Sequence, residues 1–214
     1  MKGNSFNGFD RLAALYDPLA RMMYGKSIVQ SQTCFLHLIP PFSKVLILGG
    51  GTGWLLAELL QCRPRCEVWY IESSVSMLSM AMKKNRDHRL VHFILGTEKD
   101  ILPWGVDVVI TGFFLDLFSP LTLQSVVQRI SLATKPSAVW WVADFVDQGK
   151  WWQLFFLRAM YSFFRQTCHI EACTLPPWGD VLAQSGLRQV ERRLYYGGFI
   201  VSAIYRLPDI RPSV

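Results

Sequence analysis

A glycine-rich turn is the stretch of this sequence whose residue types and spacing point most directly to ligand binding. Gly49-Gly50-Gly51-Thr52-Gly53 follows an apolar run at 45–48 and precedes a helical pattern that begins LLAELL. Glycines let a backbone turn sharply and approach a ligand closely. The turn lacks the G-x-G-x-x-G spacing of a dinucleotide site, because position 54 is Trp, and the Gly-Lys-Ser/Thr ending of a phosphate loop. Its G-x-G-x-G spacing suits a nucleoside with a short uncharged or zwitterionic tail, and a close-packed turn without a ligand is the alternative.

An acidic residue follows the next apolar run. Glu72 ends VWYIE, nineteen residues after Gly53. At the tip of a strand, a carboxylate is placed to accept hydrogen bonds from both hydroxyls of a ribose. A helix N-terminus would also favour a negative charge here, just before Ser73 and Ser74. Because the glycine turn precedes it, we favour the ribose interpretation.

The elements that must position these residues alternate between strands and helices. From Lys44 onward, apolar runs of strand length are separated by helical patterns, which is typical of a mostly parallel sheet with helices on both faces. The last two extended runs are joined through a Gly-Gly turn, which is a hairpin signal. We expect strands at 45–48, 68–71, 91–95, 106–111, 138–144, 187–195 and 199–207, and helices at 27–39, 54–61, 75–84, 121–133 and 151–165.

The length of 214 residues allows one sizeable core and demands no second domain. We therefore expect a single α/β domain with a doubly wound, mostly parallel seven-stranded sheet whose last strand is antiparallel. Within the domain we distinguish an N-terminal helical cap at 1–43, a binding core at 44–145, an aromatic helical insertion at 146–180, and a C-terminal helix and β-hairpin at 181–214.

The motifs, taken in order, resemble a known enzyme family. VLILGGGTG followed by VWYIE is similar to motif I and the acidic post-I position of class I S-adenosylmethionine-dependent methyltransferases. FDRLAALYDPL, GTEKDILPWGVDVVI and ATKPSAVWWVADF resemble segments of the ubiquinone/menaquinone-biosynthesis methyltransferase group, so the resemblance covers roughly residues 9 to 206. It implies a Rossmann-like methyltransferase fold, S-adenosylmethionine as cofactor and S-adenosylhomocysteine as product.

The resemblance also implies which part of the cofactor the residues at each strand tip would contact. The implied positions are Gly49, Gly51 and Gly53 along the path of the cofactor, Glu72 and Ser73 at its ribose, Thr97 and Glu98 near the adenine, Phe113 and Leu115 beside the methionine portion, and Tyr16 as a cap from the N-terminal helix.

Two departures from the family pattern bear on function. The strand before the glycines carries Ile47, where the family commonly has an acid that orients the methionine end of the cofactor. Backbone groups of the turn, Tyr16 or a water would have to hold that end instead. After the fourth strand, TGFF stands where enzymes that methylate planar amino groups of DNA or glutamine have Asn/Asp-Pro-Pro-Tyr/Phe, which argues against those substrates.

Methyl transfer from a sulfonium needs little acid-base machinery, because the donor is already activated and in-line positioning in a dry pocket supplies much of the rate. Asp116 is a candidate catalytic base for an acceptor hydroxyl, or else the cap of the helix that begins near Pro120. Asp144 is a second candidate base, or else it satisfies backbone groups at the end of its strand. The lone His169 is interpreted as structural.

The segment WWQLFFLRAMYSFFR, at 151–165, predicts a helix with only a narrow polar stripe. Arg158, Ser162 and Arg165 recur at spacings of 4 and 3, which leaves most of the circumference apolar. Such a helix must bury two sides. Its second partner is the N-terminal helices, a lipophilic small molecule, a homodimer mate, or a membrane face in peripheral contact. With Phe113 and Phe114 nearby, a hydrophobic small-molecule acceptor is the preferred ligand hypothesis.

Composition narrows the classes of function. The formal net charge is +6, but the basic cluster KKNRDHR has no interleaved aromatic residues, which argues against a nucleic-acid surface. The five cysteines suit a reducing compartment and lack zinc-site spacing, so we expect no metal. With neither a secretory pattern nor a spanning apolar stretch, we expect a cytoplasmic protein.

The sequence thus predicts a methyltransferase that uses S-adenosylmethionine to methylate oxygen or carbon of a small, apolar or aromatic acceptor. The absence of the acid at Ile47 and of a clear base motivates the alternative of a non-catalytic binding or scaffold protein. A third hypothesis, an RNA or protein methyltransferase, rests on the positive charge alone.

Overall fold

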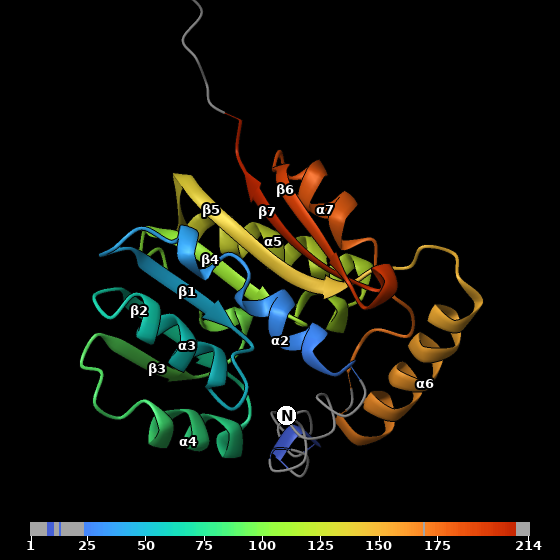
Figure 1. The fold of residues 1–214 in the computed structure, drawn as a ribbon, viewed down its shortest axis with the longest axis horizontal. Coiled ribbons are helices and arrows are strands. Elements are labelled where there is room, and N and C mark those ends of the chain that lie inside the picture. Colours follow the sequence, from blue (N-terminus) through green and yellow to red (C-terminus); the bar gives the residue numbers. More distant parts are fainter. Residues whose placement is uncertain (1–7, 11–12, 14–23, 169, 209–214) are drawn as a thin grey trace, which may run out of the picture.

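A seven-stranded sheet forms the centre of the molecule (Figure 1). The computed structural model describes residues 8–10, 13, 24–168 and 170–208. The strand order is β3-β2-β1-β4-β5-β7-β6, and the first five strands of this order pair in parallel, whereas β7 is antiparallel to both β5 and β6. The strands are β1 Lys44–Leu48, β2 Glu67–Glu72, β3 Val91–Leu95, β4 Val106–Gly112, β5 Thr134–Phe145, β6 Arg188–Tyr195 and β7 Ile200–Arg206.

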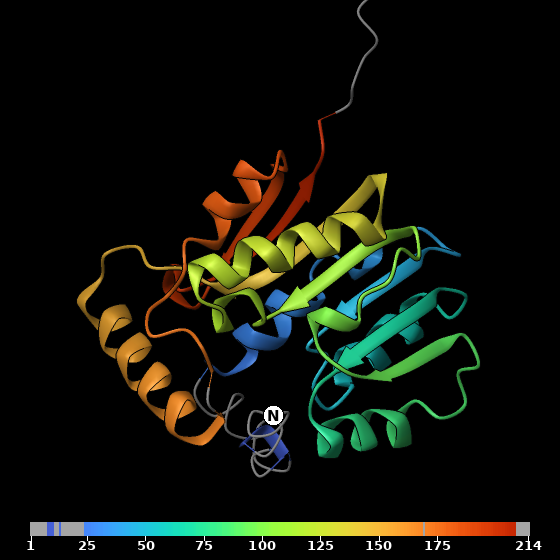
Figure 2. The same ribbon diagram turned by 180° about the vertical axis from the view of Figure 1, so that it is seen from behind.

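Helices cover both faces of this sheet, as Figures 1 and 2 show from opposite sides. One face packs against α2 (Lys26–Thr33), α3 (Trp54–Cys62) and α4 (Val75–Lys84), and the other against α5 (Pro120–Ala133) and α7 (Trp178–Gln184). The long helix α6 (Trp151–Cys168) stands beyond the carboxyl ends of the parallel strands. The predicted doubly wound α/β fold with an antiparallel last strand is therefore confirmed.

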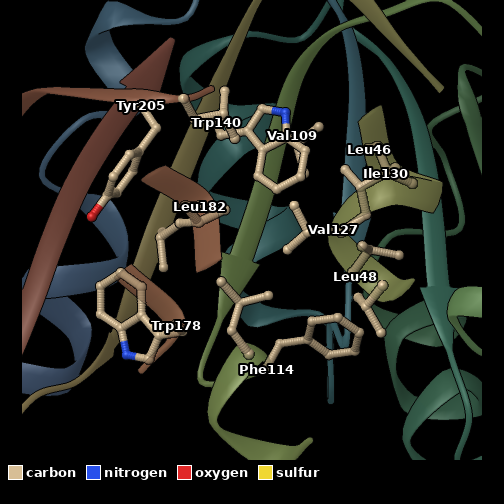
Figure 3. Close-up of a cluster of buried hydrophobic side chains, with 14 of the residues drawn as sticks. Leu46, Leu48, Val109, Phe114, Val127, Ile130, Trp140, Trp178, Leu182 and Tyr205 are labelled. Carbon is tan, nitrogen blue, oxygen red and sulfur yellow. The ribbon is translucent and has the colours of Figure 1, made fainter. Parts of the chain in front are cut away.

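The two core layers follow from the alternation of side chains along the strands. Leu46 and Leu48 of β1 point to the α5 side, where they meet Val127 and Ile130 in the cluster drawn in Figure 3. Ile47, between them, points to the α3 side. Because successive strand residues alternate between faces, the apolar run VLIL at 45–48 supplies both layers and is buried throughout.

Most predicted elements agree with the structure within one or two residues, and one helix does not. The predicted helix at 27–39 is divided, since α2 ends at Thr33 and a 3-10 turn, η1 (Leu36–Leu38), follows. The ring of Phe35 turns into the core and packs edge-on against Trp141, with ring centroids 5.9 Å apart. The backbone of Phe35 leaves helical geometry at this point, with φ −113° and ψ 3°.

The other differences concern ends. β5 begins at Thr134 instead of 138, because Thr134 pairs with Val106 before an irregularity that accommodates the extra residues. The α6 helix continues past Arg165 to Cys168. The predicted Gly-Gly turn is the 3-10 turn η4 (Tyr196–Gly198), whose three residues all have positive φ.

Candidate functional site

A cavity opens at the carboxyl ends of β1, β2 and β4. Its lining includes residues 49–52 of the glycine turn, Glu72 and Ser73 at the end of β2, and residues 112–114 at the end of β4. The strand order reverses between β1 and β4, which is where open α/β sheets bind ligands. The structure thus brings the glycine turn, Glu72, Ser73 and Phe113 together around one cavity.

The glycines of the turn serve different purposes. A Cβ on Gly49 would lie 2.7 Å from the ring of Phe114, and one on Gly50 would lie 2.2 Å from the ring of Tyr70. A Cβ on Gly53 would lie 2.6 Å from Ala81. Gly51 also has a positive φ, of 65°, but meets nothing within 4 Å. Packing therefore explains three of the glycines, and Gly51 is the one whose missing side chain leaves open space at the cavity.

Tyr70 of β2 supports the turn through a hydrogen bond. Its hydroxyl donates a hydrogen bond to the carbonyl oxygen of Gly51, at 2.9 Å. At the start of the turn, the amide of Gly49 donates to the carbonyl of Ile71, at 3.0 Å. These contacts fix the turn to β2, so its backbone is organised before any ligand arrives.

Glu72 is the buried acid of the site, with only 6% of its surface exposed. Its Oε2 accepts a hydrogen bond from the Gly51 amide at 2.9 Å, and its Oε1 accepts one from the Ser74 amide at 2.8 Å. Burial raises the pKa of this carboxyl, and the backbone amides oppose that effect. Each oxygen keeps further acceptor capacity, so two hydroxyls on neighbouring carbons can bind here without displacing the amides.

The segment before α2 also reaches this site. Phe9 lines the cavity, and Oδ1 of Asp10 accepts hydrogen bonds from the Ser74 hydroxyl at 2.6 Å and from the Ser76 amide at 2.9 Å. Asp10 is therefore anchored at the N-terminus of α4, next to Glu72. Tyr16, the predicted cap, lies outside the described residues.

Several predicted site residues do not line the cavity. Thr97 caps the short turn η2 (Glu98–Asp100), with its hydroxyl and amide both engaged in a capping box with that turn. Neither Thr97 nor Glu98 belongs to the cavity lining, nor do Gly53 and Leu115. Leu115 is fully buried in the α5-side core.

Asp116 and Asp144 form a buried pair beside the cavity rather than in its lining. Oδ2 of Asp144 accepts hydrogen bonds from the amides of Leu115 and Asp116, at 3.1 and 3.3 Å, and Oδ1 accepts one from Phe145 at 2.8 Å. Asp144 thus satisfies backbone groups and pins the segment after β4. Asp116 does not cap α5, because Ser119 does.

One carboxyl oxygen of Asp116 is unusual for a buried polar atom. Its Oδ1 is buried and has no hydrogen-bond partner among the described residues. Burial raises the pKa of Asp116 to about 7, although a hydrogen bond with Asp144 opposes the shift. Burial and then the Asp116 charge raise the pKa of Asp144 well above its ordinary value. Burial therefore favours a proton shared by this pair.

Gln32 is a polar lining residue that the sequence interpretation missed. It comes from α2, and its amide nitrogen lies 2.6 Å from where a Cβ on Gly112 would be, so Gly112 makes room for it. The Gln32 side chain makes no hydrogen bond within the described parts of the chain. Ile47, at the position where the family carries an acid, is buried and lines the same cavity.

A cluster of packed aromatic side chains, called the aromatic compartment below, lies between the cavity and α6. Tyr24, Phe113, Phe145 and Phe199 pack together there, with ring centroids of Phe113 and Phe145 at 4.8 Å. The inner face of α6 closes the compartment, and the Tyr161 hydroxyl donates to the carbonyl oxygen of Asp116 at 3.2 Å. The compartment therefore adjoins both the cavity and the buried acid pair.

The described residues contain no group of three or more His, Cys, Asp or Glu side chains that could hold a metal ion. None of their helices has the length and apolar character needed to cross a membrane.

Comparisons with known proteins place the fold. No protein-family model and no curated protein sequence matches this chain. Among solved structures, the N-methyltransferase NodS from Bradyrhizobium japonicum, in complex with S-adenosylhomocysteine, has a TM-score of 0.73 at 15% identity, and the match covers 97% of this chain and 100% of NodS.

Two O-methyltransferases are also similar. NcsB1 from neocarzinostatin biosynthesis, in complex with S-adenosylhomocysteine and 1,4-dihydroxy-2-naphthoic acid, has a TM-score of 0.69 at 17% identity over 93% of this chain and 59% of NcsB1. The mitomycin 7-O-methyltransferase MmcR has a TM-score of 0.65 at 20% identity, and the match covers 94% of this chain and 61% of MmcR. The chain thus spans about three fifths of these two enzymes. At such identities the likeness concerns architecture, and this chain has the fold of the class I S-adenosylmethionine-dependent methyltransferases.

Proposed function

We propose that this protein is an S-adenosylmethionine-dependent methyltransferase acting on a small apolar or aromatic acceptor. The observation that carries the proposal is the arrangement of Glu72 and Gly51. A buried carboxylate with spare acceptor capacity lies 2.9 Å from the amide of Gly51, the one glycine of the turn that faces open space. The two hydroxyls of a ribose fit the carboxylate. Because the turn lacks the lysine of a phosphate loop, an adenosyl group without phosphates fits it better than a nucleotide does.

The cofactor would supply a methyl group already activated on a sulfonium, and the residues of the chain would bind and orient it. Glu72 accepts hydrogen bonds from the ribose hydroxyls. Gln32 meets the amino-acid end, in place of the acid that is absent at Ile47. A side-chain amide is chemically suited to this zwitterionic group, because its NH₂ donates to a carboxylate and its oxygen accepts from an ammonium.

The acceptor is assigned to the apolar side of the cavity. Phe113 and Phe114 line it there, and Phe145 packs behind Phe113. An aromatic or apolar molecule fits such walls, and the naphthoic acid bound by NcsB1 is of this class. We assign transfer to oxygen or carbon, with Asp116 as the base for an acceptor hydroxyl. At 2% exposure Asp116 must be uncovered by a movement of the compartment before it can act.

Binding of S-adenosylhomocysteine to the full chain, measured by titration calorimetry, tests the cofactor assignment. We expect the wild type to bind, and Glu72→Gln to bind at least tenfold more weakly because a charged acceptor of two hydroxyls is lost. Glu67→Gln is the matched control, since Glu67 lies at the other end of β2 and contacts His92. Absence of binding by the wild type would refute the proposed function.

A second titration isolates Gln32. The variant Gln32→Ala should bind S-adenosylhomocysteine about tenfold more weakly, yet bind methylthioadenosine, which lacks the amino-acid end, as the wild type does. Gln30→Ala, on the exposed side of the same helix, should leave both affinities unchanged. Equal losses for both ligands would contradict the assignment of Gln32 to the amino-acid end.

The buried state of Asp116 favours one alternative, a protein that binds the cofactor and transfers no methyl group. Assays with hydroxylated naphthoic acids and quinols separate the two functions. A wild type that binds S-adenosylhomocysteine but methylates none of these acceptors, and whose Asp116→Asn variant is indistinguishable from it, would favour the non-catalytic alternative.

A further inference from the structure

The outer face of α6 exposes large apolar side chains that its core packing does not use. Trp151 is 81% exposed, and Phe155, one helical turn later, is 67% exposed. Leu154 and Phe163 are also exposed. Figures 1 and 2 show α6 at the edge of the molecule, with one side facing the body and the other facing away from it. Exposed apolar clusters of this kind mark interaction surfaces.

The charges on this helix are all positive. Arg158 and Arg165 are exposed, and α6 contains neither Asp nor Glu. Lys150 immediately precedes the helix, and its ammonium donates a hydrogen bond to the carbonyl oxygen of Gly197 at 2.8 Å. Aromatic rings together with arginines and lysines are the composition of helices that lie in the interfacial layer of anionic membranes.

A second copy of the chain fits this face less well than a lipid surface does. In a two-fold contact the same patch meets itself. Arg158 and Arg165 of both copies would then share one interface to which α6 contributes no acid. Like charges brought together in this way are costly, whereas anionic headgroups supply the missing negative charge.

We propose that α6 docks this protein on an anionic lipid surface. Trp151 and Phe155 lie at the boundary between headgroups and acyl chains, and Arg158 and Arg165 contact lipid phosphates. The inner face of the same helix closes the aromatic compartment, so docking places that compartment against the lipid. Because it needs no cofactor, this proposal stands or fails separately from the proposed function.

Cosedimentation of the full chain with vesicles tests the proposal. We expect binding to equimolar phosphatidylcholine and phosphatidylglycerol, weaker binding to phosphatidylcholine alone, and further weakening with added salt. The double variant Trp151→Ser/Phe155→Ser should bind at least tenfold more weakly. Arg158→Gln and Arg165→Gln should each reduce binding to the anionic vesicles about fivefold and leave binding to phosphatidylcholine unchanged.

Phe42→Ser is the matched control, because Phe42 is 66% exposed and precedes β1, which begins on the opposite side of the molecule from α6 (Figure 1). It should bind vesicles as the wild type does. The proposal is overturned if the wild type does not bind anionic vesicles, or if Phe42→Ser weakens binding as much as the α6 variants do. It is also overturned if sedimentation velocity shows a dimer that Trp151→Ser/Phe155→Ser dissociates.

Discussion

Replacing Asp116 by asparagine should change how the stability of the protein depends on pH. Burial favours a proton on the pair of Asp116 and Asp144 in the folded state, whereas an unfolded aspartate releases it near its ordinary pKa. In the folded protein the pKa of Asp116 is raised to about 7 from 3.8. Between these values the folded state binds more protons than the unfolded state does. The free energy of unfolding therefore falls as the pH rises through that window.

The size of the effect follows from the shift. One pKa unit corresponds to about 1.4 kcal/mol, so a shift from 3.8 to about 7 amounts to a loss on the order of 4 kcal/mol between pH 4 and pH 7. Glu72 and Asp144, whose pKa values burial also raises, add slopes of the same sign in both proteins. The Asp116→Asn variant keeps one neutral side chain beside Asp144, so its curve should be flatter than that of the wild type across this range.

Urea unfolding followed by tryptophan fluorescence at a series of pH values measures both curves. The test is the slope, because an amide in this buried position changes absolute stability for other reasons. Asp87→Asn is the matched control, since the Asp87 side chain is 90% exposed. If the stability of Asp116→Asn fell with rising pH as steeply as that of the wild type, the inference of a proton shared by Asp116 and Asp144 would be wrong.

Four further variants probe the turn and the segment after β4. Gly51→Ala should unfold at most about 2 kcal/mol more easily yet lose S-adenosylhomocysteine affinity, whereas Gly50→Ala should lower the melting temperature more, because its methyl group would enter the Tyr70 ring. Tyr70→Phe removes the hydrogen bond to the turn and should cost about 1 kcal/mol in chemical denaturation; an unchanged midpoint would contradict that support. Ser119→Ala removes the N-cap of α5 and should lower the free energy of unfolding by about 1 kcal/mol. A variant as stable as the wild type would show that Ser119 is not the residue that caps this helix.

The sheet could be predicted from sequence because its signals are local. Apolar runs of strand length and a Gly-Gly turn identified all seven strands, although not the start of β5. The irregularity there depends on how Thr134 pairs with Val106, which no local pattern specifies. The division of the predicted helix at 27–39 likewise depends on a distant partner, Trp141, against which Phe35 packs.

The site was predictable in its glycine turn and Glu72, and less so elsewhere. Which glycines serve packing depends on rings from β2 and from the segment after β4, so spacing alone could not separate Gly51 from the others. Gln32 reaches the cavity only because the chain returns to Gly112 in the fold. Thr97 did carry a usable local signal, since T-E-K-D is a capping-box pattern that favours a local role.

The strand order leaves β6 as an open edge of the sheet, and this has a consequence for solubility. An exposed edge offers unpaired backbone groups to a second strand and invites aggregation. Arg188, Arg192 and Arg193 accompany one acid, Glu191, on this strand, so an approaching copy meets an excess of positive charge. Edge-to-edge growth is thereby opposed, and neutralising these arginines should make the protein precipitate more readily while leaving its cavity intact.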